Sequence, residues 1–136
     1  MADELMVEIA TPEKMVFSDK VEEVTIPGVD GEFGVLFGHA PLLTLVNIGE
    51  LDYTRDNKKI HYAIGAGYVE VTFQKVTLLL DSAERSDEID KESAKKEKDA
   101  AEAELSKMNK EEDKGYKGAK DKLSLAEARL KVAEKA

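Results

Sequence analysis

Few residues of this chain could carry out chemistry. It has two histidines, His39 and His61, and no cysteine, which excludes a cysteine nucleophile and a thiolate metal site. His39 could act as a general base, but no serine or cysteine nucleophile motif accompanies it, so a role in a loop or an interface is favoured. His61 alternates with Ile60 and Tyr62 in a strand-like pattern and is interpreted as a strand residue without chemistry. Two histidines so far apart indicate no metal cluster, so no catalytic or metal-binding residue is predicted.

Two glycine-rich segments, residues 28–34 and 65–67, invite comparison with phosphate-binding loops. Backbone amides without a neighbouring Cβ can approach an anion closely. Neither segment is followed by Lys-Ser or Lys-Thr, and neither opens a helix after a strand. Turns and bulges are therefore the favoured interpretation of both.

The acidic composition excludes some partners. The net charge of the 136 residues is −9 and Trp is absent, so the phosphates of a nucleic acid would be repelled. No run approaches 18 apolar residues, and the first ten residues lack the pattern of a signal peptide. With no cysteine to pair, we expect a chain in a reducing cytoplasmic setting that is not inserted in a membrane and reaches one only through a partner.

The elements that position these residues differ between two parts of the chain. Residues 1–83 contain 6 basic and 14 acidic side chains, and residues 84–136 contain 14 and 15. In the first part β-branched and aromatic residues alternate with polar ones, which is typical of the strands of a β-sandwich or barrel. Asp56-Asn57 predicts a tight hairpin. The pattern predicts eight or nine strands, at 5–10, 15–17, 21–26, 34–37, 42–46, 50–55, 59–64, 67–73 and 75–80.

The second part has a helical period. A helix is expected from about Glu88, capped by Ser86 or Asp87, and residues 109–118, with two glycines, predict a turn before a second helix. The apolar stripes of the two helices are rich in alanine: Ala94, Ala101, Leu105 and Met108, then Ala119, Leu123, Ala126, Leu130 and Ala133. Such a helical hairpin buries little area, so we expect it to be marginal alone and stabilised by docking on another surface.

The segment from Gly31 to Thr44 reads GEFGVLFGHAPLLT and resembles the signature of the epsilon-subunit family of bacterial F-type ATP synthases. The string GHAPLLT is specific, and Phe37, where the family usually has proline, departs from the pattern. Residues 11–18, 66–71 and 76–83 match further family segments, so the resemblance extends over essentially the whole chain. It implies a ten-stranded β-sandwich over residues 1–84, followed by an antiparallel two-helix hairpin over residues 85–136.

The resemblance implies a subunit that is not an enzyme by itself. In this family the subunit belongs to the rotating central stalk, couples ion flow through the c-ring to ATP synthesis, and lies at the cytoplasmic face of the plasma membrane. The matching positions place Glu32 against the polar loops of the c-ring. They place Thr11, His39 and Thr44 toward the gamma subunit, although strand or turn structure is the alternative for Thr11 and Thr44.

The helical hairpin resembles the regulatory element of the family, which can extend along gamma and block ATP hydrolysis. The resemblance then implies that Lys122, Arg129 and Lys131 meet an acidic segment of the beta subunits, within the alpha and beta head. Some members bind ATP on the folded hairpin, and the corresponding positions are Ile89, Asp90, Ala94 and Arg129. Here Ser93 replaces an arginine of that motif, so a forked cation is missing. We expect ATP binding to be weak or absent and predict no other cofactor.

Two other classes of function stay open from the residues alone. A free-standing β-sandwich adaptor with a coiled-coil interaction tail explains the architecture but leaves the segment from Gly38 to Thr44 unexplained. An enzyme explains least, because the sequence has no nucleophile motif, metal constellation or phosphate loop.

Overall fold

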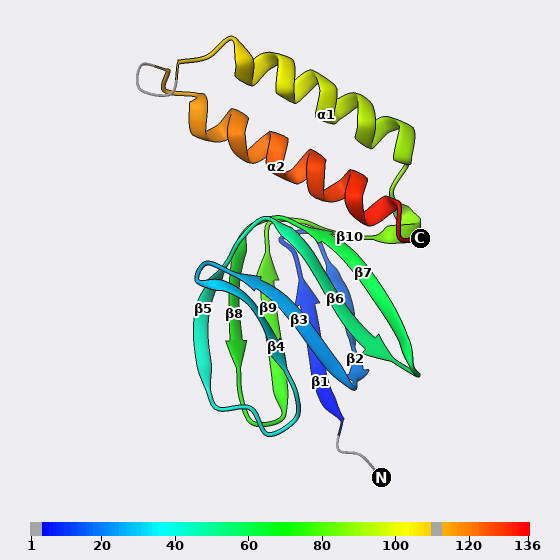
Figure 1. Cartoon of the computed structure of the whole chain (residues 1–136). Coiled ribbons are helices and arrows are strands. Elements are labelled where there is room, and N and C mark those ends of the chain that lie inside the picture. The colour runs from blue at the N-terminus through cyan, green and yellow to red at the C-terminus, as the bar shows by residue number, and fades with distance from the viewer. Residues whose placement is uncertain (1–3, 110–112) are drawn as a thin grey trace.

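The computed structural model describes residues 4–109 and 113–136 and consists of a β-sandwich with two helices at one end (Figure 1). The strands are β1 (Leu5–Ala10), β2 (Met15–Val21), β3 (Glu23–Gly28), β4 (Gly31–Val35), β5 (Leu42–Val46), β6 (Gly49–Arg55), β7 (Lys58–Ile64), β8 (Gly67–Val71), β9 (Lys75–Leu80) and β10 (Ala83–Arg85). A short 3-10 turn, η1 (Ser86–Glu88), leads to α1 (Lys91–Ser106) and α2 (Tyr116–Ala133). The expected fold class, a ten-stranded sandwich followed by a two-helix hairpin, is confirmed.

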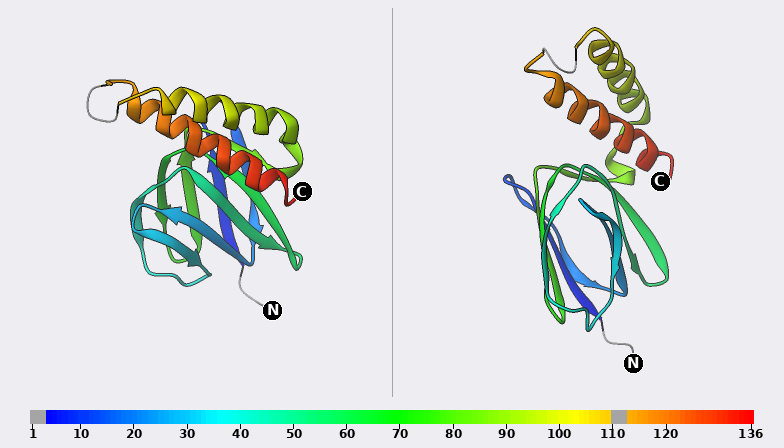
Figure 2. Two further views of the ribbon diagram at one scale, coloured as in Figure 1. Left: turned by 45° about the horizontal axis from the view of Figure 1, so that its top comes forward. Right: turned by 60° about the vertical axis from the view of Figure 1, so that its left-hand side comes forward.

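The strands form one continuous sheet that folds over into two layers (Figure 2). Its order is β10-β7-β6-β3-β5-β8-β9-β1-β2, with β4 paired to β3. The pairs are antiparallel except β1 with β9, which is parallel. The sheet passes between the layers where β3 meets β5 at a single pair, Gly28 with Val46. Alternate residues of most strands point inward and form one core, which includes Leu5, Ile26, Leu51, Val69 and Leu78.

Local sequence decides the turns between strands. Asp56 and Asn57 have φ of 53° and 62°, so the predicted tight hairpin between β6 and β7 is confirmed with both turn residues left-handed. Gly31 has φ of 123° and follows the end of β3 by three residues. This turn lets β4 begin at once.

Several strand predictions were wrong in their bounds. The strands expected at 15–17, 21–26 and 67–73 span 15–21, 23–28 and 67–71. The strand expected at 34–37 is β4 at 31–35, because the chain pairs with β3 directly after the turn and leaves the sheet after Val35. The alternating pattern did not reveal β10, which has three residues and is too short to alternate. It pairs with β7 and extends the sheet to Arg85.

The predicted start of the first helix was also wrong. Ser86, Asp87 and Glu88 form the separate 3-10 turn η1, and Asp90 caps α1. The Asp90 carboxylate accepts hydrogen bonds from the Glu92 amide at 3.2 Å and from the Ser93 hydroxyl at 2.8 Å. Asp90 is the N-cap because the chain is extended at Ile89, which turns into the interface with the sandwich.

The connection between the helices begins and ends earlier than predicted, because α1 ends at Ser106, before the predicted stripe residue Met108. The second helix begins at Tyr116 with Gly115 as its N-cap, so Gly118 lies inside α2. Residues 110–112 of the predicted turn lie outside the described residues.

The hairpin is folded onto the sandwich, with α2 lying between α1 and the ends of β6 and β7 (Figures 1 and 2). The stripes predicted to join the helices are partly buried, with Ala94, Ala101, Ala119 and Ala126 fully so. A second face of α2, carrying Ala128 and Val132, was not predicted. It packs on the sandwich in a small apolar cluster of Ala63, Ile89, Ala94, Ala128 and Val132. The expectation that the hairpin is stabilised by docking is met by this surface of its own chain.

Candidate interaction surfaces

The outer face of one layer carries a row of apolar side chains that strand register brings together. Leu45 lies opposite Tyr68, Tyr68 opposite Leu79, Leu79 opposite Ala10, and Ala10 opposite Met15. This apolar row therefore crosses β5, β8, β9, β1 and β2 in a straight line. Leu45 is 60% exposed, Met15 54%, Tyr68 48% and Leu79 42%. A continuous exposed apolar strip of this kind is typical of an interaction surface.

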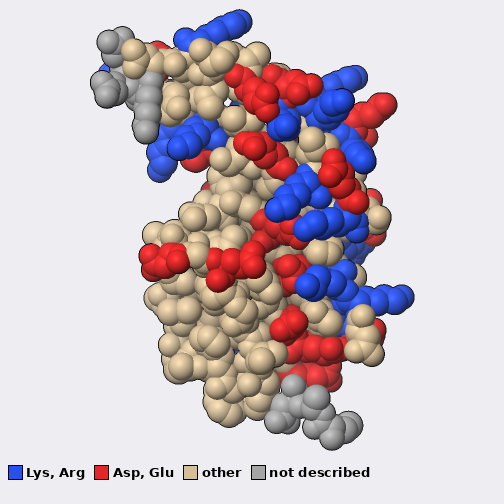
Figure 3. Space-filling view, in the orientation of Figure 1, with Lys and Arg blue, Asp and Glu red and all other residues tan. Residues whose placement is uncertain are grey.

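Sequence reasoning missed this row because each residue lies on a different strand. On the face that Figure 3 shows, charged side chains gather over the helices and one flank of the sandwich, with a smaller acidic group on the other side. The signal was nevertheless present, since Leu43 and Leu45 alternate with inward positions in β5. Only the pairing register converts such single exposed residues into a surface.

The three residues expected to face gamma are not brought together. Thr11 directly follows Ala10 and, with Tyr68 and Leu79, lines a shallow groove beside the apolar row. His39 lies in the loop before β5, at the opposite end of the sheet, with its Nδ1 2.6 Å from the Ala40 carbonyl oxygen. Thr44 is half-buried on the inner side of β5, paired with the buried Val69. Of the three, only Thr11 adjoins the exposed row.

Glu32, expected to face the c-ring, lies on the β3–β4 hairpin. It is exposed and stands opposite Pro27 in the ladder, one residue after the turn at Gly31. Its carboxylate is close enough to contribute to raising the pKa of Asp52 on β6, although burial of Asp52 is the larger cause. Glu32 is thus part of an acidic corner of the sandwich.

Arg129 joins the hairpin to the sandwich. Its Nε donates to Glu84 Oε1 on β10 at 2.8 Å, and its Nη1 donates to Glu97 on α1. The Arg129 side chain is only 15% exposed. Burial disfavours its charge, but the hydrogen bonds that it donates to both glutamates outweigh burial and raise its pKa. In the folded hairpin this guanidinium is engaged by its own chain.

The other two cations expected to meet the beta subunits, Lys122 and Lys131, are exposed to solvent in the folded hairpin. Lys122 has a 70% exposed side chain and only a long ion pair, 3.8 Å, to Glu104. Lys131 is exposed near the end of α2. The predicted inhibitory group is therefore divided, with Arg129 inside the molecule and Lys122 and Lys131 outside.

The four positions of the ATP motif all take part in the folding contacts of the hairpin. Ile89 and Ala94 are buried in the cluster against Ala63. Asp90 caps α1, and Ser93, which stands where the family motif has arginine, donates to it. With Arg129 held by Glu84, each group has an intramolecular partner.

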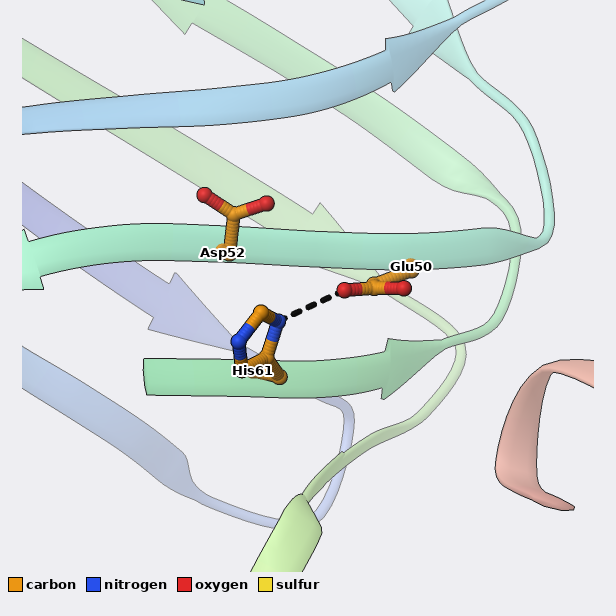
Figure 4. A group of neighbouring side chains, drawn as sticks. All are labelled: Glu50, Asp52 and His61. Atoms are coloured by element: carbon orange, nitrogen blue, oxygen red, sulfur yellow. Dashed lines mark hydrogen bonds and ion pairs between the residues drawn. The ribbon is translucent and has the colours of Figure 1, made fainter. Parts of the chain in front are cut away.

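Three donor side chains meet on the outer face of β6 and β7 (Figure 4). Asp52 stands opposite His61 in the ladder, and Glu50 lies two residues along on the same face. His61 Nδ1 is 2.6 Å from Glu50 Oε2, while Lys135 donates to both oxygens of Glu50 at 2.6 and 2.8 Å. Burial disfavours ionisation of Glu50, but the hydrogen bonds from Lys135 and His61 together outweigh burial and lower its pKa. The expectation of no metal cluster did not foresee this grouping.

Comparison with known proteins identifies the family. The description "ATP synthase, Delta/Epsilon chain, beta-sandwich domain" matches residues 4–86, and "ATP synthase, Delta/Epsilon chain, long alpha-helix domain" matches residues 87–134. The chain belongs to the ATP synthase delta/epsilon family. It is 48% identical to the ATP synthase epsilon chain of Geotalea uraniireducens, over 100% of this chain and 98% of that one. The epsilon chain of Nitratidesulfovibrio vulgaris is 42% identical over 97% of each chain.

Solved structures share the fold. A chain of the Euglena gracilis mitochondrial ATP synthase, a structure of OSCP, F1 and c-ring, has a TM-score of 0.81 at 23% identity and covers 98% of this chain and 83% of that one. A chain of the Tetrahymena thermophila mitochondrial ATP synthase central stalk and c-ring has a TM-score of 0.59 at 13% identity, with coverage of 95% and 96%.

As an epsilon-type chain, the molecule is a non-catalytic subunit of the ATP synthase complex. Within the described residues, neither helix combines the length and the apolar character needed to cross a bilayer.

Proposed function

We propose that this subunit works in the central stalk, where it couples ion flow through the c-ring to ATP synthesis and restrains ATP hydrolysis with its C-terminal helices. The observation that carries this proposal is the pairing of two unlike surfaces in one chain. One is the exposed apolar row, which suits a lasting contact, and the other is a helical hairpin held by a small cluster and an ion-paired arginine. The first suits an anchor and the second a movable element.

The apolar row is the proposed contact with the gamma subunit. Leu45, Tyr68 and Leu79 project from three adjacent hydrogen-bonded strands, so the backbone that carries them is already in place before binding. Thr11 borders the row and adds a polar group at its edge. His39 and Thr44 retain the gamma role only as implied by the family resemblance.

The c-ring contact is proposed at the β3–β4 hairpin through Glu32. The carboxylate is exposed at a tight turn, where it can reach polar loops of another protein. In this arrangement the subunit lies peripherally at the cytoplasmic face of the bacterial plasma membrane, held by protein contacts alone.

The proposed brake is the helical hairpin in an extended state, reaching the beta subunits of the head. The cluster that holds it down contains Ile89, Val132 and three alanines, and the partly buried Leu130 and Ala133 pack against it. Burial of a large aliphatic side chain contributes about 1.5 to 3 kcal/mol, so the two packings can differ by a few kcal/mol. Extension separates Arg129 from Glu84 and adds its charge to Lys122 and Lys131, opposite an acidic beta segment.

ATP bound to the folded hairpin is expected to play at most a weak part. The motif lacks a cation at Ser93, and Arg129 is already satisfied by two carboxylates. A nucleotide would have to displace Glu84 and Glu97 from the guanidinium.

The test is ATP hydrolysis by a reconstituted alpha-beta-gamma head with no added chain, the full chain, or a truncation ending at Asp87. The truncation keeps the sandwich core, which is separate from the cluster under the hairpin. We expect the full chain to inhibit, and the truncation to bind without inhibiting. High salt should weaken the inhibition, because the contact with beta is ionic. If neither chain inhibits although both bind, the brake is refuted and the anchor stands; if neither binds, both are refuted.

A further inference from the structure

We infer that Glu50, Asp52 and His61 form a binding site for one divalent transition-metal ion, of the zinc type, on the outer face of β6 and β7. One ligand atom from each residue lies within 4.8 Å of the other two. The three come from two hydrogen-bonded neighbouring strands, so the backbone that carries them is fixed by the ladder. One imidazole nitrogen and two carboxylate oxygens make a three-ligand set that leaves a further position for water.

The electrostatics of the site favour a cation. Two carboxylates share a half-buried surface. The Asp52 backbone pairs with Thr25 and His61, but its carboxylate makes no hydrogen bond or ion pair within residues 4–109 and 113–136. Burial and the nearby Glu50 and Glu32 charges raise the pKa of Asp52, although Lys59 and His61 act against this. A carboxylate held in such surroundings gains from a bound divalent ion more than an exposed one does.

The donor set selects among ions. Magnesium and calcium prefer oxygen ligands, whereas imidazole nitrogen favours zinc, cobalt and nickel. His61 Nδ1 and Glu50 Oε2 are 2.6 Å apart, and two ligands of one tetrahedral zinc stand about 3.3 Å apart. The site is completed when the His61 and Glu50 ligand atoms move apart by less than about 1 Å and the Asp52 carboxylate moves toward them.

The ion and the helical hairpin compete for the same carboxylate. The Lys135 ammonium, which follows α2, bonds both oxygens of Glu50. A metal ion on Glu50 displaces that ammonium and removes one of the ties between the end of the hairpin and the sandwich. By linkage, release of the hairpin must then strengthen metal binding by the same factor as metal binding weakens docking.

The experiment is calorimetric titration of the full chain with zinc chloride in a non-coordinating buffer. The chain has two histidines and no cysteine, so His39→Gln is a matched control for His61→Gln. We expect one saturable site, weakened at least about tenfold by His61→Gln or Asp52→Asn and unchanged within about twofold by His39→Gln. Lys135→Gln removes the competitor and should tighten binding about threefold.

The direction in which Lys135→Gln changes the zinc affinity distinguishes binding at this site from binding elsewhere on the surface. NMR of the histidine ring protons during the same titration should show the His61 signal shifting and the His39 signal unmoved. If His61→Gln does not fold, Asp52→Asn takes its place, and its His61 signal should need at least about tenfold more zinc to shift. Absence of saturable binding, or equal losses for both histidine variants, would overturn the site. Binding that is unchanged or weakened by Lys135→Gln would overturn its competition with the hairpin.

Discussion

Arg129 joins α2 both to the sandwich and to α1. Its guanidinium makes two hydrogen bonds to Glu84, at 2.8 and 3.3 Å, and one to Glu97. A hydrogen bond to a charged group contributes about 1.5 to 3 kcal/mol, while an exposed ion pair contributes about 0.2 to 1 kcal/mol. Glu84 is 36% exposed and Glu97 53%, so the Glu84 contact dominates. We expect Arg129→Ala to weaken docking by about 1 to 2 kcal/mol, or about 5- to 30-fold in the docked-to-released ratio.

Hydrogen exchange of the α2 and β10 amides measures this ratio in the isolated chain. Arg129→Ala should speed exchange across α2 by the stated factor and leave the sandwich core unchanged. A double-mutant cycle with Glu84→Gln should recover at least about 1 kcal/mol of coupling between the two residues. Arg55→Ala is a matched control, because its pair with Asp19 is 43% and 47% exposed and lies outside the hairpin. Equal exchange in Arg129→Ala and the parent chain would refute the assignment of docking to this pair.

Four further substitutions have expected outcomes. A Cβ at Gly67 would lie 2.0 Å from the Leu79 carbonyl oxygen, whereas one at Gly118 meets nothing within 4 Å. In thermal unfolding, Gly67→Ala should therefore lower the free energy of unfolding by roughly 3 kcal/mol or more, and Gly118→Ala should raise it by about 0.5 to 1 kcal/mol. Ala128→Leu inserts bulk between α2 and the sandwich and should cost about 1 to 3 kcal/mol of docking, seen as faster α2 exchange with an unchanged sandwich. The hydrogen bond from the Ser93 hydroxyl lowers the pKa of Asp90 below its ordinary 3.8. The stability that this cap gives α1 is therefore present above pH 3.8 and is lost as the pH falls through the lower pKa of the folded state. An NMR titration of the carboxyl group should show the lowered pKa, and Ser93→Ala should move it back toward 3.8; an unchanged pKa in Ser93→Ala would contradict this role of Ser93.

Much of the fold could be predicted from the sequence because its signals are local. Strand alternation, the Asp56-Asn57 turn and the change to a helical period depend on residues within a few positions of one another. The start of α1 could not be predicted from spacing alone. Ile89 is drawn into a contact with Ala63 of β7, and that long-range packing decides which acidic residue becomes the cap.

The candidate surfaces were less accessible because they depend on register. The apolar row joins residues from five strands, and no local pattern specifies that order. The contact between Glu50 and His61 could have been predicted from the sequence, because a two-residue turn at 56–57 pairs Asp52 with His61 and places Glu50 beside them. The placement of Arg129 inside the molecule was not, because it requires β10 and both helices to be positioned first.

In the proposed function the sandwich anchors the subunit through the apolar row. The affinity of the full chain for a reconstituted alpha-beta-gamma head tests this anchor. Leu79 lies in the row and is 42% exposed, whereas Leu36 lies in the loop between β4 and β5, at the opposite end of the sheet, and is 58% exposed. Each is replaced by aspartate, and thermal unfolding verifies that both variants are folded. We predict that Leu79→Asp weakens binding at least about tenfold, a loss of about 1.4 kcal/mol, while Leu36→Asp binds like the parent chain. Equal affinity of the two variants would contradict the anchor.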